Sequence, residues 1–312
     1  MPMNYAGYSL PNFLPMSSNN SNLTSALSRQ MQNLRRQVDQ IDLKMLKLLQ
    51  QRTKLSGQIG KMKRRHGAVI YVPERERALV ARLARLGKGQ PPPKALAAVY
   101  REIMSSSRAA QGQTPIGLLQ ASASLVLPAS CASFGACDQF SPQKNWADLV
   151  KGLETGALSL ALLTGDDLVK ALQTPRHQSE FLAGLTVAGD FSPPFEADAP
   201  LARRIFIVTP RGGGAAWDPD RILILIECKS TVNAIKSLLR SMPDFSIQAE
   251  YLPQQAKPGS ARKGLSVALA RLTLAKPVDG IRATSQLLSA CKLANIPVSI
   301  LGIYPGTEDH GG

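Results

Sequence analysis

The sequence is poor in the residues that build metal and redox centres. Its 312 residues contain four cysteines and three histidines, and no two cysteines form a Cys-x-x-Cys pair. A zinc or iron–sulfur site needs several such side chains at short spacing, so we expect neither a metal nor another cofactor. Reduced thiols are typical of cytoplasmic proteins, and we expect a cytoplasmic location.

Long apolar runs are also absent. No stretch approaches the about 18 consecutive apolar residues of a membrane-spanning helix. The first 28 residues are rich in Asn, Ser and Pro, carry no Lys or Arg, and lack the apolar centre of a signal peptide. We predict a disordered tail at 1–28 and a short tail at 307–312, with Met31 as an alternative start.

Acidic residues are scarce in one part of the chain. Residues 28–111 hold 19 Lys and Arg against 5 Asp and Glu, a balance of +14 within a net charge of +15. Such a segment attracts nucleic acid, acidic lipid or a small polyanionic metabolite. Few aromatic residues and no helix-turn-helix pattern argue against nucleic acid, so we expect neither nucleic acid nor membrane as partner.

An apolar stripe follows the first predicted helix, at 28–65. Its residues alternate in steps of four and three, as on one packing face: Leu34, Val38, Ile41, Met45, Leu48, Leu55, Ile59 and Met62. Arg52 occupies a position within this stripe. Because a buried unpaired charge is costly, we expect Arg52 to meet an anion. The helix is about 55 Å long, which favours a partner along its length.

Polar residues recur on the packing faces of two further helices, predicted at 73–87 and 94–111. Glu76 falls in line with the leucines of the first, whereas Ser107 and Gln111 extend the apolar stripe of the second. The prediction places Gly87 at the C-terminal cap of the first.

The inward faces therefore offer a carboxylate, a hydroxyl and an amide, together with two cations. Lys63 follows Arg52 by three helical turns and faces the same way, about 16 Å away. This set suits a small dianion that carries a hydroxyl group, handled by positioning and electrostatics. For each residue alone the ordinary alternative stays open, because Arg and Lys on such stripes often extend their charged ends into water.

Beyond a linker at 111–115 the pattern becomes α/β. We predict strands at 116–120, 158–163, 185–188 and 204–208, helices at 146–155 and 166–172, and a glycine linker at 212–214. After residue 221 the order is βαββαβ, the ferredoxin-like arrangement. Its strands are predicted at 222–228, 245–252, 264–274 and 297–304, and its helices at 231–242 and 278–294.

The segment 33–111 resembles the all-helical class of chorismate mutases. The likeness rests on Leu34-Arg35-Arg36-Gln37-Val38-Asp39-Gln40-Ile41-Asp42, Leu48-Leu49-Gln50-Gln51-Arg52, Ile59-Gly60-Lys61-Met62-Lys63, Pro73-Glu74-Arg75-Glu76 and Ser107-Arg108-Ala109-Ala110-Gln111. The resemblance implies an intertwined, all-helical homodimer that rearranges chorismate to prephenate in the biosynthesis of phenylalanine and tyrosine.

The resemblance also implies a role for each site residue. Arg52 and the partner subunit's Arg35 would hold the two carboxylates of the substrate, and Ser107 would add a hydrogen bond to one of them. Glu76 would accept from the ring hydroxyl.

Lys63 and Gln111 would donate to the ether oxygen of the breaking bond, and Arg75 would orient the site. Val72 stands where the family often has Asp, a mild departure if that position acts through its backbone N–H.

The remaining chain resembles the other parts of bifunctional chorismate mutase–prephenate dehydratases. Residues 153–160 are similar to a stretch of the dehydratase domain, but the region is about half the needed length. The catalytic Thr-Arg-Phe motif would fall on Arg203-Arg204-Ile205, which lacks the threonine, so we expect no dehydratase activity.

The C-terminal segment resembles an ACT regulatory domain, whose closing stretch is similar to Leu301-Gly302-Ile303-Tyr304-Pro305. Asn233-Ala234-Ile235 and Ala249-Glu250-Tyr251-Leu252 replace its usual ligand motifs, so a structural or dimerising role is as well supported as amino-acid binding.

The sequence thus predicts a multidomain chorismate mutase: a helical domain at 29–112, a degenerate dehydratase-like region at 115–218 and an ACT-like domain at 221–306. Two alternatives remain. One is a bifunctional protein with residual dehydratase activity, and the other is a non-catalytic basic helical binding module.

Overall fold

The computed structural model describes residues 18–66, 71–194, 196, 199–211, 220–228, 248–254, 266–273 and 280–305. The predicted helix at 231–242, the glycine linker at 212–214 and the tails at 1–17 and 307–312 lie outside these residues. The chain divides into two compact units, of which the first ends at Arg52 and the second begins at Thr53. Within the described residues, no helix is both long and apolar enough to cross a membrane.

The first helix, α1 (Ser18–Arg65), ends at the predicted residue but begins at Ser18 instead of Ser28. Residues 18–28, predicted as part of a disordered tail, are helical. Neither proline nor glycine interrupts them, and extending an existing helix costs far less free energy than nucleating a new one.

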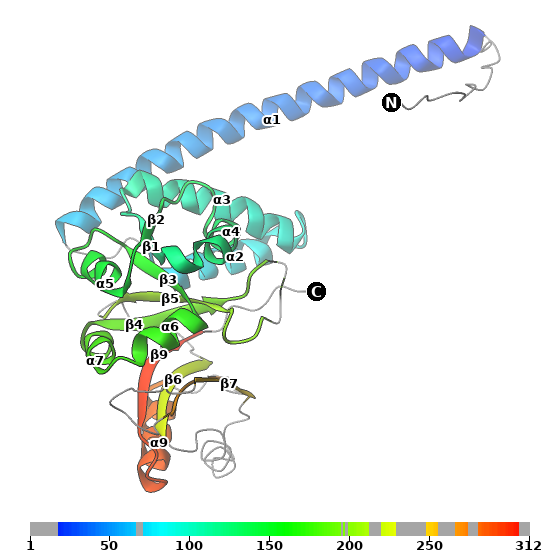
Figure 1. Ribbon diagram of the computed structural model, residues 1–312. Helices are drawn as coiled ribbons and strands as arrows, with labels where there is room; N and C mark the ends of the chain where they lie inside the picture. Colours follow the sequence, from blue (N-terminus) through cyan, green and yellow to red (C-terminus); the bar gives the residue numbers. More distant parts are fainter. Residues whose placement is uncertain are drawn as a thin grey trace, which may run out of the picture. The chain divides into compact units, whose positions relative to one another are not determined.

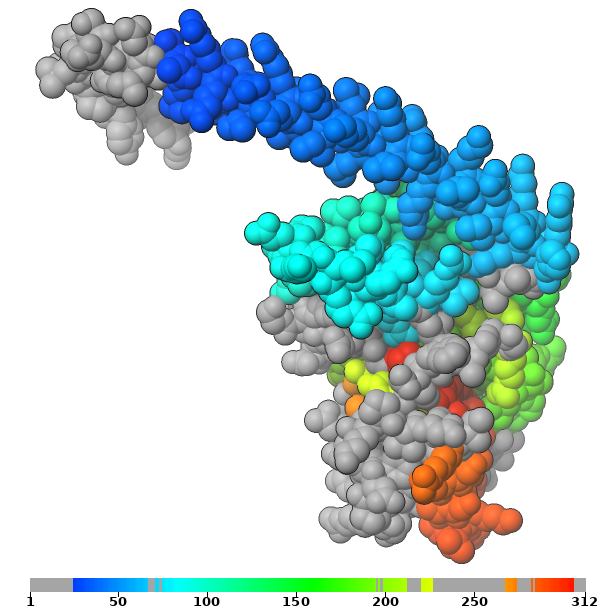
Figure 2. Space-filling view, turned by 180° about the vertical axis from the view of Figure 1, so that it is seen from behind, coloured from blue at the N-terminus to red at the C-terminus, as the bar shows by residue number. Residues whose placement is uncertain are grey.

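The apolar stripe of α1 lies on an exposed surface of the first unit. Among residues 18–52 the structure describes only this helix, and Leu34, Val38 and Ile41 each expose slightly more than half of their surface (54%, 55% and 54%). Figure 2 shows helix α1 in blue. A row of large exposed apolar side chains marks an interaction surface.

Two shorter helices follow, α2 (Pro73–Gly87) and α3 (Pro93–Gln111), within one residue of their predicted bounds. Proline opens each helix. The N–H groups of the first turn have no partner within a helix, so the missing N–H of proline costs no hydrogen bond there. The left-handed residue after α2 is Lys88, with a φ of 49°, whereas Gly87 is still helical. The prediction of Gly87 as the cap is therefore one residue too early.

A five-stranded mixed sheet forms the centre of the second unit (Figure 1). Its strands are β1 (Ile116–Leu119), β2 (Phe140–Gln143), β3 (Leu160–Thr164), β4 (Leu185–Phe191) and β5 (Ile205–Pro210). Their order is β2-β1-β3-β5-β4. Strand β1 is parallel to β2 and β3, whereas β5 is antiparallel to β3 and β4. Strand β2 was not predicted from the sequence, because it contains a proline, which only an edge strand such as β2 tolerates well.

Helices cover both faces of this sheet. On one face lie α5 (Trp146–Glu154), α6 (Gly165–Leu172) and α7 (Pro175–Gly184), whose apolar residues share a core with β3, β4 and β5. On the other face lies α4 (Ala123–Phe134). The prediction missed α4, which contains Pro128, and α7, whose sequence is largely polar.

A second sheet, at the C-terminal end, has four antiparallel strands. They are β6 (Arg221–Cys228), β7 (Gln248–Gln254), β8 (Ser266–Thr273) and β9 (Val298–Tyr304). The order β7-β8-β6-β9 places the first and third strands of the segment at the centre of the sheet, as in the ferredoxin-like arrangement predicted for it. Helix α9 (Gly280–Leu293) packs on one face, and residues of the other face share the core of α5, α6 and α7.

A buried charge cluster joins the two sheets. Asp190 in β4 is fully buried and accepts hydrogen bonds from Arg204, just before β5, and from Arg271 in β8. Arg221, which begins β6, places a guanidinium nitrogen 3.9 Å from the same carboxylate. Burial and then the Asp190 charge hold the pKa of the neighbouring Tyr304 well above its usual value. One carboxylate thus links side chains from both sheets.

We expect Asp190→Asn to destabilise the fold strongly. Asparagine keeps the shape but removes the charge that offsets buried guanidinium groups, and breaking such a pair costs about 3–5 kcal/mol. Urea unfolding followed by circular dichroism measures the loss. The control Asp148→Asn, at an exposed position in the first turn of α5, should cost no more than about 1 kcal/mol. Equal losses in the two variants would contradict this role of Asp190.

Candidate functional site

The last turns of α1 approach the C-terminal end of α3 very closely. Gly60 is buried, and a Cβ at this position would collide with the backbone of Gln111. The Arg64 guanidinium donates a hydrogen bond to the carbonyl oxygen of Gln111. Because position 60 has no side chain, the turn of α1 that carries Lys63 can lie against the end of α3.

Lys63 is half-buried and interacts electrostatically with two charged residues in the first turn of α2. Burial lowers the pKa of Lys63 below its ordinary value, the Arg75 guanidinium lowers it further, and the Glu76 carboxylate opposes both effects. Three of the predicted site residues, from α1 and α2, therefore lie within electrostatic reach of one another.

Glu76 is held by a residue that the sequence analysis did not select. The Nη1 atom of Arg108 in α3 lies 2.6 Å from each carboxylate oxygen of Glu76. The side chain of Arg108 is 3% exposed, that of Glu76 25%. The carboxylate predicted to accept from a substrate hydroxyl is thus already oriented by a buried cation.

Arg108 has further partners in the α/β region. It donates to the Asp138 carboxylate at 2.7 and 3.1 Å and to the carbonyl oxygen of Phe134 at 2.6 Å. Its guanidinium carbon lies 5.5 Å from the ring centre of Tyr71 and 5.8 Å from that of Phe134. Burial acts to lower the pKa of Arg108, but hydrogen bonds and charges from Asp138 and Glu76 outweigh it and raise that pKa.

Ser107 and Gln111 lie one turn apart at the end of α3. The Ser107 hydroxyl is buried and donates to the Ile103 carbonyl at 2.7 Å. The Gln111 amide nitrogen donates to the Ser107 carbonyl at 3.2 Å. Its Oε1 is buried and has no hydrogen-bond partner among the described residues. Gln111 therefore retains one polar atom for a further contact.

Val72 precedes α2, and its backbone carbonyl takes part in the first turn of that helix. Its carbonyl oxygen accepts hydrogen bonds from the N–H groups of Arg75 and Glu76, at 3.1 and 3.3 Å. No side chain caps the helix here. An apolar residue at this position is therefore compatible with the start of α2.

Arg35 and Arg52 belong to the first unit, whereas the other predicted site residues belong to the second. Arg35 is exposed and Arg52 is half-buried. The grouping of these arginines with Lys63 remains a prediction from the sequence.

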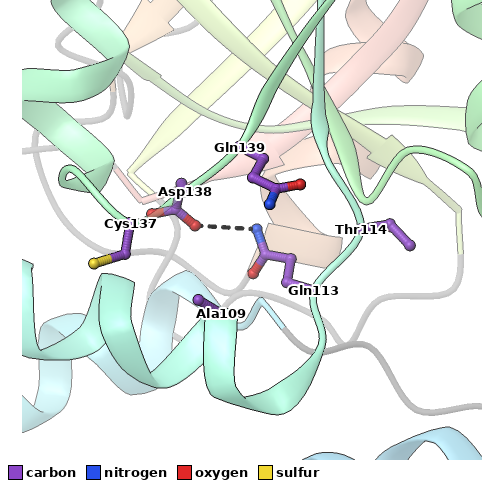
Figure 3. Close-up of a pocket in the computed structure, with 6 residues that line it drawn as sticks. All are labelled: Ala109, Gln113, Thr114, Cys137, Asp138 and Gln139. Carbon is purple, nitrogen blue, oxygen red and sulfur yellow. Dashed lines mark hydrogen bonds between the residues drawn. The ribbon is translucent and has the colours of Figure 1, made fainter.

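A pocket of about 70 Å³ lies beside Asp138 (Figure 3). It is lined by Ala109, Gln113, Thr114, Cys137, Asp138 and Gln139. The predicted site residues do not line it, and its volume is far below the about 300 Å³ at which ligand pockets begin. We do not assign it to the substrate.

The charged and polar side chains of the candidate site suit a reaction that is promoted by fixed charges and hydrogen-bond donors. Lys63 and Arg75 supply cations, Glu76 supplies an oriented acceptor, and Ser107 and Gln111 supply neutral polar groups. One feature of the sequence could have pointed to Arg108: it is a charged residue directly after Ser107, on a helix predicted to pack. Its partner Asp138 lies 30 residues further on, so spacing within the helix could not reveal the pair.

Comparison with known proteins agrees with the family resemblance noted for the helical segment. Residues 34–112 match the model of the chorismate mutase type II family. The chain is 32% identical over 130 residues to the bifunctional chorismate mutase/prephenate dehydratase of Aquifex aeolicus, covering 40% of this chain and 36% of that protein. It is 37% identical over 75 residues to the T-protein of Enterobacter agglomerans, covering 24% and 20%.

The chain therefore spans only about a third or less of the length of these curated relatives. A solved prephenate dehydratase from Streptococcus mutans is 14% identical, with a TM-score of 0.42 over 62% of this chain and 100% of that one. A likeness this low carries no argument about fold or function.

Proposed function

We propose that this protein is a chorismate mutase that rearranges chorismate to prephenate. The match of residues 34–112 to the type II family carries the proposal. The electrostatic grouping of Lys63, Arg75 and Glu76 supports it, because the family mechanism needs cations and an acceptor at one place. Biosynthesis of phenylalanine and tyrosine in the cytoplasm is the setting that this activity implies.

The reaction needs no nucleophile, since one bond breaks and another forms within a single substrate. Negative charge develops on the ether oxygen as its bond to carbon breaks. In our proposal Lys63 donates to this oxygen, and the Gln111 amide turns from the Ser107 carbonyl to donate beside it. Preorganised donors stabilise such charge without reorganisation during the reaction.

The substrate has to be held in a compact conformer before it can react. We propose that Arg52, the partner subunit's Arg35 and Ser107 bind its carboxylates, while Glu76 accepts from its ring hydroxyl. The exposed stripe of Leu34, Val38 and Ile41 supports a homodimer, because a second copy of α1 would bury it.

We propose that the rest of the chain has no dehydratase activity and ends in an ACT-like domain. Arg203 stands where the dehydratase motif has threonine, and Arg204 is engaged with Asp190 and with Ser192. The β7-β8-β6-β9 order supports the ACT-like assignment. A structural role for this domain fits the burial of its inner face against α5–α7.

Purified protein is expected to convert chorismate to prephenate, and Lys63→Ala is expected to lower kcat by about 10²–10³, the cost of one lost transition-state donor. Loss of chorismate absorbance measures the rate. Lys61→Ala is the matched control, because Lys61 is an exposed lysine on another side of the same helix. Equal turnover in the two variants would refute the role of Lys63.

Turnover is expected to fall at alkaline pH with a midpoint below the ordinary lysine value of about 10.4. Lys63 donates in its charged form, and its lowered pKa means that this form is lost earlier as the pH rises. A pH profile of kcat measures the midpoint. In Lys63→Arg the side chain stays charged, so the decline should move to higher pH. An unchanged profile would exclude Lys63 as the titrating group.

Mixing two inactive variants tests whether the partner supplies Arg35. Co-expressed Arg35→Ala and Lys63→Ala chains should recover about a quarter of normal activity, because half the random pairs are mixed and each regains one of two sites. The control pair Lys63→Ala and Gln111→Ala should recover none, since every site then lacks one residue. No recovery in the first mixture would argue against a shared site.

A further inference from the structure

Arg108 lies inside the segment that matches the mutase family, but two of its partners lie outside it. One side of the guanidinium donates to the carbonyl oxygen of Phe134, at the end of α4, and to the carboxylate of Asp138, in the loop that follows. The remaining nitrogen, Nη1, meets both oxygens of Glu76. One planar group is therefore fixed by the α/β region and in turn fixes a residue of the candidate site.

The loop that carries Asp138 is built to lie against α3. Gly135 has a φ of 105°, and a Cβ there would collide with the side chain of Ser105. Ser105 donates to Asp138 at 2.7 Å and accepts from the N–H of Cys137. The side chain of Asp138 is 2% exposed.

A further polar contact comes from the chain just after α3. Figure 3 shows Gln113 reaching Asp138, to which its amide nitrogen donates at 3.4 Å. Asp138 thus has little freedom to move, and neither has the guanidinium that it binds.

We propose that Arg108 is a positioning residue for the rearrangement, and that Asp138 of the α/β region completes the mutase site by holding it. This inference rests on the proposed mutase function. Glu76 has three rotatable side-chain bonds, and Arg108 restricts them to one orientation. Without Arg108 the carboxylate would be free to turn toward Lys63 or Arg75, away from the substrate hydroxyl. A misplacement of about 1 Å costs on the order of 10² in rate.

The test uses the full chain and Arg108→Gln, with kcat/KM for chorismate as the readout. We expect a loss of about 10- to 100-fold. Arg101→Gln is the matched control: Arg101 is on the same helix but pairs with Glu102 and is 37% exposed. It should leave kcat/KM within about twofold. Circular dichroism and thermal melting check that each variant folds.

A double-mutant cycle separates positioning from general stabilisation. Glu76→Gln retains an acceptor for the hydroxyl and gives a reduced reference activity. If Arg108 acts through Glu76, adding Arg108→Gln to this variant should cost less than about threefold, because coupled residues are not additive. An equal loss in both backgrounds would overturn the proposal.

Asp138→Asn provides a second route if Arg108→Gln does not fold. Asparagine keeps the shape of the Asp138 side chain but weakens its ion pair with Arg108. We therefore expect kcat/KM to fall in the chain that carries Glu76, but not in the Glu76→Gln background. Arg108→Lys, which preserves charge but not the planar fork, should restore part of the activity at most. Normal activity in Asp138→Asn and Arg108→Gln would overturn this inference alone. An unaltered chain that does not convert chorismate would overturn the proposed function as well.

Discussion

The ion pairs of the Arg108 guanidinium determine how the helical part of the second unit is held. A buried cation is stable only if its charge is offset and its N–H groups are bound. Arg108 meets this demand with Glu76 from α2, Asp138 from the loop after α4 and the carbonyl of Phe134. These elements must therefore stay in register with α3. The candidate site residues Ser107 and Gln111 lie on the same helix, so their positions depend on that arrangement.

A buried charge of the opposite sign, the carboxylate of Asp190, joins the two sheets in the same way. Asp190 is an anion in a fully buried position, and arginines from three strands or strand ends converge on it. The planar guanidinium fork suits such junctions better than the ammonium of lysine, because it binds several acceptors in one plane. In a chain with a net charge of +15, scarce carboxylates thus become the points at which separate elements are fastened.

These clusters also clarify how a strongly basic segment can form a selective site. Most of its cations are exposed and act as a diffuse attraction for anions. Lys63 is half-buried, and burial and the Arg75 charge lower its pKa, whereas the Glu76 charge opposes them. In the proposed function this attraction would bring the dianionic substrate near, and fixed geometry would decide whether it reacts. Holding Glu76 through Arg108 is one way in which the α/β region contributes to that geometry.

Local pattern was sufficient to predict much of this protein. The helix predicted at 28–65, the proline that opens α2, and the strands β6 to β9 with helix α9 follow from patterns between neighbours in sequence, and the described residues reproduce them. Elements without such a pattern were missed, including α4 with its internal Pro128 and the edge strand β2.

The sequence by itself determined which polar residues share a helix face with an apolar stripe, because helical periodicity depends only on spacing. It singled out Lys63, Glu76, Ser107 and Gln111, but not what neutralises or orients them. Only the tertiary structure decided that Glu76 pairs with Arg108 and Arg108 with Asp138. Charges pair across space wherever burial removes water, and residues 30 apart in sequence have no local pattern that links them.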